Sequence, residues 1–407
     1  MKKNIVKNTS YLYIMNIVKM IFPLIILPYL TRVLSVESYG VVAYNKAIMQ
    51  YMQLFVDFGF ILSGTRDIVM VKDNKESLKF EIGNIFVAKM ILSGFATIII
   101  IVMAFSLPIL RENLLFTFLS FLPVLLSSFL FEYVFRGLEH MEAVAIPFIV
   151  MKTVSTLLTF VFVKSDFEMI LIPILDVIGS LFAVCSIIFI MKKMKISFKI
   201  GEISEVLKKL KDSAVYFFSN MATTAFSALN TLLIGIYIEA TDVAYWSLCM
   251  QMVGAAQALF TPVTDGIYPQ MIKTREMSLI KRTLKLFLPV VTVGCIFTIV
   301  VAKYALLILG GNKYIVATSL LRVLTISLFF SFPSMLFGWP TLGAIGKEKE
   351  ATNTTVIAAI FQVVGLILLI VLDKFTVINI ALLRGATEFL LFIIRYYITK
   401  KYKDLFN

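Results

Sequence analysis

The sequence has few of the residues on which soluble enzymes rely. Only 15% of its 407 residues are charged, and it contains one histidine and three cysteines. The histidine, His140, stands near Glu139 and Glu142, which is too small a donor set for a zinc site. The cysteines lie singly in apolar segments without CxxC spacing, so neither a disulfide framework nor a metal cluster is expected. No cofactor or metal is therefore expected.

Motifs for nucleotide binding and for hydrolytic chemistry are absent as well. No G-x-x-x-x-G-K-[ST] sequence occurs, which excludes direct ATP drive by this chain. No nucleophile is accompanied by a base in a soluble context. The longest connections between apolar segments, near 64–81, 192–213 and 268–285, have only about twenty residues each. They leave no room for a soluble domain.

Long apolar runs dominate the sequence instead. Apolar residues make up 59% of it, and its mean hydropathy is +0.92, which indicates an all-α integral membrane protein. A helix needs about 20 apolar residues to cross a bilayer core. Twelve segments meet this length and predict twelve transmembrane helices, at residues 11–34, 40–63, 82–105, 114–135, 143–163, 168–191, 214–238, 243–267, 286–309, 315–339, 354–372 and 376–398.

Basic residues are distributed unevenly over the connections between these segments. The tails and connections on the side of the N-terminus hold 25 of the 38 lysines and arginines, and those on the opposite side hold 4. Cytoplasmic loops of membrane proteins carry such an excess, so both termini are expected in the cytoplasm. This sorting also accounts for the net charge of +13, and no nucleic-acid partner is expected.

The two halves of the chain resemble each other at a shift of 204 residues. The shift places Lys7-Asn8-Thr9 on Lys211-Asp212-Ser213, and Asn16 on Asn220. The identity is thin, and coincidence among apolar helices is the alternative explanation. Each half nevertheless has six predicted spans and starts in the cytoplasm. A parallel repeat of this kind implies two six-helix bundles, related by an axis along the membrane normal, with a cavity between them.

This repeat sets the expected domain organisation. Within the linker between the two bundles, residues 202–211 predict a short amphipathic helix on the inner leaflet. The expected parts are an N-terminal bundle at 1–191, a basic cytoplasmic linker at 192–213, a C-terminal bundle at 214–398 and a cytoplasmic tail at 399–407.

The N-terminal 70 residues carry a set of recognisable motifs. These are Leu27-Pro28-Tyr29-Leu30-Thr31-Arg32-Val33-Leu34, Glu37-Ser38-Tyr39-Gly40, Asp57-Phe58-Gly59-Phe60 and Gly64-Thr65-Arg66-Asp67-Ile68. Through them the chain resembles the Wzx-type polysaccharide flippases of the multidrug/oligosaccharidyl-lipid/polysaccharide (MOP) exporter superfamily. The resemblance implies a multi-pass protein of the bacterial cytoplasmic membrane. It also implies an undecaprenyl pyrophosphate-linked oligosaccharide as cargo, for an O-antigen, a capsule or another surface polysaccharide.

Ionisable side chains inside the predicted spans mark either a substrate pathway or a buried pair, since each costs about 2.5 to 3.5 kcal/mol at the centre of a membrane helix. Nine basic and five acidic residues lie in the spans. Residues near span ends, such as Arg395, are expected to extend to the head groups. The deeper basic residues are the expected substrate ligands: Lys19, Lys46, Lys89, Lys152, Arg322 and Arg384.

Four of the five acidic residues in the spans are expected to serve in coupling or in structure: Asp57, Asp176, Asp265 and Glu388. The alternative for the basic residues is a structural pair, such as Lys89 with Asp57, or Arg384 with Glu388 one helical turn away. The excess of positive charge suits an anionic substrate, because a diphosphate binds lysine and arginine through charge-assisted hydrogen bonds.

The sequence therefore predicts a flippase, not an enzyme, that moves a lipid-linked oligosaccharide across the membrane by alternating access. Its expected partners are that substrate, membrane lipids and other polysaccharide-assembly proteins. Two alternatives stay open. An ion-coupled multidrug exporter of the same superfamily would often rely on an acid in the first span, where this chain has Lys19 and Arg32. A polysaccharide polymerase would be expected to have a large extracytoplasmic loop, and the outward loops here are short.

Overall fold

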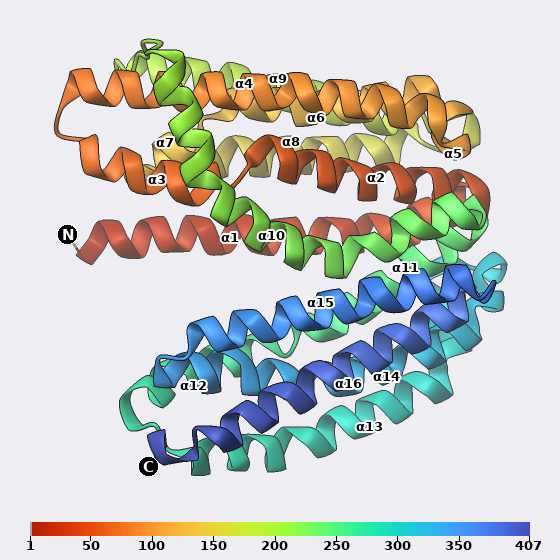
Figure 1. Ribbon diagram of the computed structural model, residues 1–407. Helices are drawn as coiled ribbons and strands as arrows, with labels where there is room; N and C mark the ends of the chain where they lie inside the picture. The colour runs from red at the N-terminus through yellow and green to blue at the C-terminus, as the bar shows by residue number, and fades with distance from the viewer. Residues whose placement is uncertain (1) are drawn as a thin grey trace. The chain divides into compact units, whose positions relative to one another are not determined.

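The computed structural model describes residues 2–407, with the backbone alone at residues 2–7, 9, 219 and 222–227. All regular secondary structure in the described range is helical, which confirms the predicted all-α class (Figure 1). The chain forms two compact units, Met1–Thr224 and Ala225–Asn407. Their boundary lies inside one helix, α10 (Ile203–Tyr237), which therefore contributes residues to both units.

Unit 1 contains nine α-helices before α10. They are α1 (Lys2–Val33), α2 (Val36–Asp57), α3 (Phe60–Val71), α4 (Lys75–Ser106), α5 (Pro108–Arg111), α6 (Leu114–Leu126), α7 (Glu132–Gly137), α8 (Glu142–Phe162) and α9 (Leu171–Lys193). Two short 3-10 helices, η1 (Ser127–Leu130) and η2 (Asp166–Glu168), lie between them.

Unit 2 continues from α10 with a similar succession of helices. They are α11 (Ala240–Ala258), α12 (Thr261–Thr274), α13 (Met277–Gly310), α14 (Thr318–Leu336), α15 (Glu348–Val371) and α16 (Val377–Lys401). Short helical turns lie at η3 (Asn312–Ala317), η4 (Phe337–Leu342), η5 (Gly343–Ile345) and η6 (Lys403–Leu405).

Polar side chains fix where several of these helices begin. The Ser35 hydroxyl accepts a hydrogen bond of 3.1 Å from the backbone N–H of Ser38 and so caps α2. Asn74 accepts from the N–H groups of Glu76 and Ser77 at the start of α4. Each cap satisfies backbone donors that the first turn of a helix leaves without a partner, and a cap of this kind stabilises a helix by about 1 kcal/mol.

Ten helical stretches of the described residues are long and apolar enough to cross a membrane. They correspond to ten of the twelve predicted spans. The remaining two predictions, 40–63 and 214–238, fall on α2 and α10. In α2 the polar and charged residues lower the hydropathy, and in α10 only Ala228–Tyr237 counts as a short apolar helix. A total of twelve spans stays a prediction.

The predicted span 40–63 is interrupted in the structure. Phe58 and Gly59 both have positive φ angles, 41° and 81°, and they separate α2 from α3. A Cβ atom on Gly59 would lie 2.5 Å from the Cβ of Tyr216, so glycine is needed both for its φ angle and for the close approach of α10. A run of apolar residues shows no sign of this break, because helix and turn can be equally apolar.

The basic connections of unit 1 gather at one end of its helices. The side-chain amide of Asn8 donates to the carbonyl of Glu139 at 2.7 Å, and Lys72 forms an ion pair of 3.5 Å with Glu139. At the opposite end, Tyr29 donates to the carbonyl of Val163 at 2.7 Å. The N-terminus and the turn between α3 and α4 thus share one end of the unit (Figure 1).

Unit 2 shows the same sorting of its connections. The backbone N–H of Asn407 donates to the carbonyl of Arg275 at 2.9 Å, so the C-terminus lies at the turn between α12 and α13 (Figure 1). The Lys347 ammonium lies 4.5 Å from the centre of the Tyr402 ring. At the other end, the rings of Tyr237 and Phe375 are 5.4 Å apart. The basic turns and the C-terminus are therefore on one side of this unit.

The basic segment after α9 packs against α4. The backbone N–H of Lys199 donates to the carbonyl of Lys79 at 3.0 Å, and a Cβ on Gly83 would lie 1.9 Å from the Lys199 carbonyl oxygen. The separate surface helix expected at 202–211 is not formed, because these residues lead into and open the 35-residue helix α10. The amphipathic pattern there reflects packing on α3 and α4.

Lys209 shows how the first turns of α10 are held. Its ammonium lies 2.9 Å from Asp67 and also contacts Glu81. Burial opposes the charge on Lys209, but the hydrogen bonds with these two carboxylates outweigh burial and raise its pKa. One turn further, the hydroxyls of Ser63 and Ser213 are 2.6 Å apart. Charge pairing and a close hydroxyl contact thus dock α10 on unit 1.

Candidate functional site

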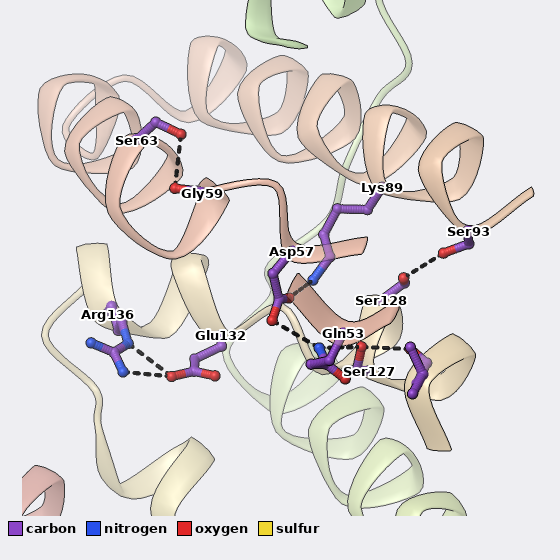
Figure 2. A network of polar contacts seen from close by, with 11 residues as sticks. Gln53, Asp57, Gly59, Ser63, Lys89, Ser93, Ser127, Ser128, Glu132 and Arg136 are labelled. Atoms are coloured by element: carbon purple, nitrogen blue, oxygen red, sulfur yellow. Dashed lines mark hydrogen bonds and ion pairs between the residues drawn. The ribbon is translucent and has the colours of Figure 1, made fainter. Parts of the chain in front are cut away.

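The Asp57 carboxylate is fully engaged in a network inside unit 1 (Figure 2). Its Oδ1 lies 2.9 Å from the Nζ of Lys89, and its Oδ2 accepts from the Gln53 amide at 2.8 Å. The same amide donates to the hydroxyl of Ser127 at 3.0 Å. Asp57 ends α2, where the helix dipole disfavours a negative charge, so Lys89 is the compensating cation. The pair predicted as an alternative use of Lys89 is formed.

Two further polar contacts surround this network in Figure 2. The hydroxyls of Ser93 on α4 and Ser128 on η1 lie 3.0 Å apart. Arg136 forms an ion pair with Glu132 one turn before it on α7, at 2.6 Å. Lys89 itself is 6% exposed. The network is therefore a closed, charge-neutral joint among α2, α4 and α6–α7 that offers no surplus cation to a substrate.

A second charged cluster in unit 1 is accessible and contains more basic than acidic residues. On α8, Lys152 lies 3.0 Å from the Oδ1 of Asp176 on α9, and Ser155 donates to the same oxygen at 3.1 Å. Lys46 on α2 is exposed and near enough for its charge to act on both Lys152 and Asp176. Asp176 thus pairs with Lys152, and the charge of Lys46 lies near this pair. The side chains of Lys152 and Asp176 are 35% and 30% exposed, so the cluster is accessible.

Lys19 of α1 contacts an aromatic residue of α8. Its ammonium lies 5.2 Å from the centre of the Phe148 ring, a cation–π distance. Phe148 precedes Lys152 by four residues on α8, so both lie on the same face of that helix. Lys19 of α1 therefore lies near the face of α8 that carries Lys152, while Asp176 pairs with Lys152. We call Lys19, Lys46, Lys152 and Asp176 the lysine cluster.

Three charged residues of α16 in unit 2, Arg384, Glu388 and Arg395, are buried among polar partners. The Nη2 of Arg384 lies 3.5 Å from the Oε1 of Glu388, and Ser334 donates to Glu388 at 3.4 Å. Arg384 and Glu388 are each 5% exposed. The structural pair predicted as the alternative for Arg384 is thus formed, one helical turn apart on α16.

Arg395 also belongs to this group, which corrects the sequence-based expectation that it reaches the head groups. It is 8% exposed and donates to the Ser334 carbonyl at 2.7 Å. It donates as well to the hydroxyls of Thr354 and Thr355, each at 3.0 Å. Arg395 follows Glu388 by two helical turns on the same face of α16. The spacing of two turns from Glu388 could have predicted that Arg395 is buried. Its position near the end of a predicted span suggested instead that it reaches the head groups.

The remaining predicted residues of unit 2, Arg322 and Asp265, are exposed. Arg322 on α14 is exposed, and its Nε donates to the carbonyl of Ile299 at 3.0 Å. Asp265 is an exposed residue of α12. Within unit 1, Lys19, Lys46 and Lys152 belong to the lysine cluster, while Lys89 pairs with Asp57. Within unit 2, Arg384 pairs with Glu388, and Arg322 donates to a backbone carbonyl of α13.

Buried amides in unit 2 connect helices and do not face an open site. The Gln362 amide donates to the Asn230 oxygen at 3.0 Å, and the Thr387 hydroxyl donates to Gln362 at 2.5 Å. All three side chains are buried. Interhelical hydrogen bonds of this kind hold membrane helices together. Asn230, which could have contacted a sugar by residue type alone, serves packing.

A groove of about 860 Å³ lies between α8 and α9. Its walls are largely apolar, formed by residues such as Ile146, Val150, Phe182 and Phe189. Lys193 lines the groove where α9 ends. None of the six basic residues predicted as substrate ligands lines it, so the groove and the lysine cluster are separate features.

Comparison with known proteins decides the family. The family model for polysaccharide biosynthesis proteins matches residues 5–275, which is about two thirds of the chain. The chain belongs to this family. Two relatives of this polysaccharide biosynthesis protein are each named "Putative O-antigen transporter". The one from Shigella dysenteriae is 29% identical over 270 residues, covering 66% of this chain and 67% of the relative. The one from Escherichia coli (strain K12) is 24% identical over 282 residues, covering 69% and 68%.

Solved structures show which fold this polysaccharide biosynthesis protein has. The lipid II flippase MurJ in an inward closed conformation matches with a TM-score of 0.67 and 17% identity, over 97% of this chain and 87% of MurJ. An inward-facing multidrug resistance MATE family transporter of the MOP superfamily matches with a TM-score of 0.65 and 12% identity, over 95% and 99%. The fold is that of the MOP superfamily, and the predicted resemblance is confirmed. Ten helices among the described residues could cross a membrane, and together with the family this shows a multi-pass protein of the bacterial inner membrane.

Proposed function

We propose that this protein is a flippase that moves an undecaprenyl pyrophosphate-linked oligosaccharide from the inner to the outer leaflet by alternating access. The observation that carries the proposal is the lysine cluster, in which Lys152 pairs with Asp176, Lys46 lies near this pair and Lys19 lies beside Phe148 on the same helix as Lys152. Such an excess of positive charge within spans is costly unless an anion compensates it. A diphosphate linked to a lipid is an anion that must pass the bilayer core.

The need for such a protein is physical. A sugar chain and a pyrophosphate carry many polar groups, and moving each one into hydrocarbon without a hydrogen-bond partner costs several kcal/mol. The lipid chain can stay in the membrane while the head group passes through a polar route. Lys19, Lys46 and Lys152 would bind the diphosphate on that route. Arg322, an exposed residue of unit 2, is a separate proposed ligand of the substrate.

Relatives and fold favour transport of a glycan over the two alternatives. The two relatives are each named "Putative O-antigen transporter", and the matching solved structures are a MATE family transporter and the flippase MurJ. This supports transport over the polymerase alternative. The multidrug exporters share the fold alone with this chain. The lysine cluster would repel an organic cation, which argues against that cargo.

The predicted two-bundle repeat and the cytoplasmic termini are part of this proposal. Helices at corresponding places begin 204 residues apart, as α2 and α11 do at Val36 and Ala240, and α6 and α14 do at Leu114 and Thr318. This supports a parallel repeat with twelve spans. The basic turns of each unit share one end, which supports cytoplasmic termini. Membrane lipids and other polysaccharide-assembly proteins are the proposed partners.

The test is the sidedness of the lipid-linked oligosaccharide in cells. In a strain without this protein, the intermediate is expected to accumulate on the inner leaflet, where an enzyme added to spheroplasts cannot reach its sugar. Restoring the wild-type gene is expected to make the sugar accessible from outside. A variant with Lys46→Gln and Lys152→Gln is expected to insert in the membrane normally but to leave the sugar inaccessible from outside. Unchanged sidedness in the strain without the protein would contradict the proposal.

A further inference from the structure

We propose that Asp176 is a displaceable counter-ion of the substrate site: it holds Lys152 when the site is empty and gives way to a phosphate oxygen when the lipid diphosphate binds. This inference rests on the proposed function and adds a residue that sets both affinity and release. Asp176 would be a positioning residue, since it acts through Lys152 and does not itself bind the anionic substrate.

The geometry of the carboxylate supports exchange. Lys152 and Ser155, both on α8, approach the same oxygen of Asp176, Oδ1, at 3.0 and 3.1 Å. The two donors are three residues apart and share a helix face, so one incoming oxygen atom in the place of Oδ1 can accept from both. A non-bridging phosphate oxygen has the charge and the acceptor capacity that this requires.

The exposure of the pair supports exchange as well. The side chains of Lys152 and Asp176 are 35% and 30% exposed, whereas those of Lys89 and Asp57 are 7% and 20% exposed. Asp57 uses both of its oxygens, one for Lys89 and one for Gln53. A ligand could replace Asp57 only by breaking a closed network. Asp176 can be replaced at one accessible contact.

The balance of charge decides whether Lys152 pairs with Asp176 or with the substrate. Without substrate, Asp176 neutralises one of the lysines of the cluster and lowers the cost of holding them in the membrane. With substrate bound, the diphosphate neutralises them more fully, and Lys152 changes partner. Asp176 recovers Lys152 when the diphosphate leaves. The carboxylate therefore weakens binding of the anion by competition and repulsion, and it speeds release.

The test compares Asp176→Asn with wild-type protein, both full length and purified in detergent, using undecaprenyl pyrophosphate as the binding probe. The amide keeps the size of the side chain and an oxygen for Ser155, but it removes the charge. A unit charge within about 8 Å of a bound anion, at an effective dielectric constant near 20, changes affinity by roughly tenfold or more. We expect the variant to bind the probe roughly tenfold more tightly and to turn over more slowly in cells.

Asp57→Asn is the matched control, because it removes the charge of the other carboxylate of unit 1. It is expected to lower thermal stability without tightening binding of the probe. A purely structural role for Asp176 predicts instead a lower melting temperature and weaker or equal binding, and a role in ion coupling predicts unchanged binding. Either result would overturn the inference, as would absence of binding by both Asp176→Asn and wild type.

Failure of the proposed function gives a different pattern. If Asp176→Asn binds the probe more tightly but loss of the protein leaves the sidedness of the oligosaccharide unchanged in cells, the anion site stands and the cargo is wrong. If sidedness changes as proposed but Asp176→Asn does not bind more tightly, the flippase stands and the counter-ion role is wrong. The two claims are therefore tested separately.

Discussion

Lys89 and Asp57 form an ion pair of 2.9 Å in which the lysine is almost fully buried and the second carboxylate oxygen is bonded to Gln53. The pair closes the C-terminal end of α2 against α4. This buried pair differs from the more exposed Lys152–Asp176 pair, whose lysine is accessible to a substrate.

Replacing Lys89 alone is expected to destabilise the protein strongly, because it leaves the Asp57 carboxylate buried without its cation. Breaking a buried pair in this way costs about 3 to 5 kcal/mol. Lys89→Met should therefore unfold at a clearly lower temperature in detergent. The double variant Lys89→Met with Asp57→Asn should recover much of the loss, since no uncompensated charge remains. A single variant as stable as wild type would show that the pair is not structural.

Lysines of the cluster are expected to affect transport and not folding. Lys152→Gln and Lys46→Gln each remove a charge that would bind the diphosphate, and such a contact is worth about 1.5 to 3 kcal/mol. Export of the surface polysaccharide should fall by roughly tenfold or more, with normal amounts of protein in the membrane. Lys303→Gln is the matched control, because Lys303 is an exposed lysine of α13. Equal export by all three variants would exclude the cluster from the pathway.

Arg395 is expected to be a structural residue of unit 2. Arg395→Gln removes donors to Ser334, Thr354 and Thr355 at once, in the buried region shared by α14, α15 and α16. Loss of such a buried network should cost about 3 to 5 kcal/mol. Lys400→Gln, at an exposed site of the same helix, should change stability by less than about 0.5 kcal/mol. Thermal unfolding of the two variants side by side measures the difference, and equal stabilities would contradict the structural role.

The break between α2 and α3 is expected to require glycine. Gly59→Ala places a Cβ on a residue with φ of 81° and within 2.5 Å of Tyr216, so strain and overpacking should together cost about 2 to 4 kcal/mol. Gly94→Ala, within α4 and open to its surroundings, should instead be neutral or stabilise by up to about 1 kcal/mol. The same effect of both substitutions on the melting temperature would contradict the close approach of α10 to Gly59.

The lengths of the apolar segments predicted the helical class and the positions of ten spans, because an apolar segment in a membrane has few alternatives to a helix. It could not reveal the break at Phe58 and Gly59, where apolar residues continue through a turn. It also gave no reason to start a 35-residue helix at Ile203. That helix depends on contacts of Lys209 and Ser213 with α3 and α4, which are far away in the sequence.

The candidate site was predictable as a set of residue types but not as a set of partners. Depth in a span placed Lys46, Lys89 and Lys152 in one class, and only the structure separates the buried Lys89 from the more accessible Lys46 and Lys152. Distance from a span end misplaced Arg395, because it says nothing about which way a side chain faces. Pairing in a membrane is decided by the faces that neighbouring helices share, and a single sequence does not contain this information.

The most direct test of the account is transfer of an undecaprenyl pyrophosphate-linked oligosaccharide between the leaflets of liposomes that contain the purified protein. The account predicts that wild-type protein makes the sugar on the inner leaflet accessible to an enzyme added outside. A variant with Lys19, Lys46 and Lys152 all changed to Gln should be inserted equally well and show little transfer. Equal transfer by wild-type protein, the triple variant and empty liposomes would contradict the central claim.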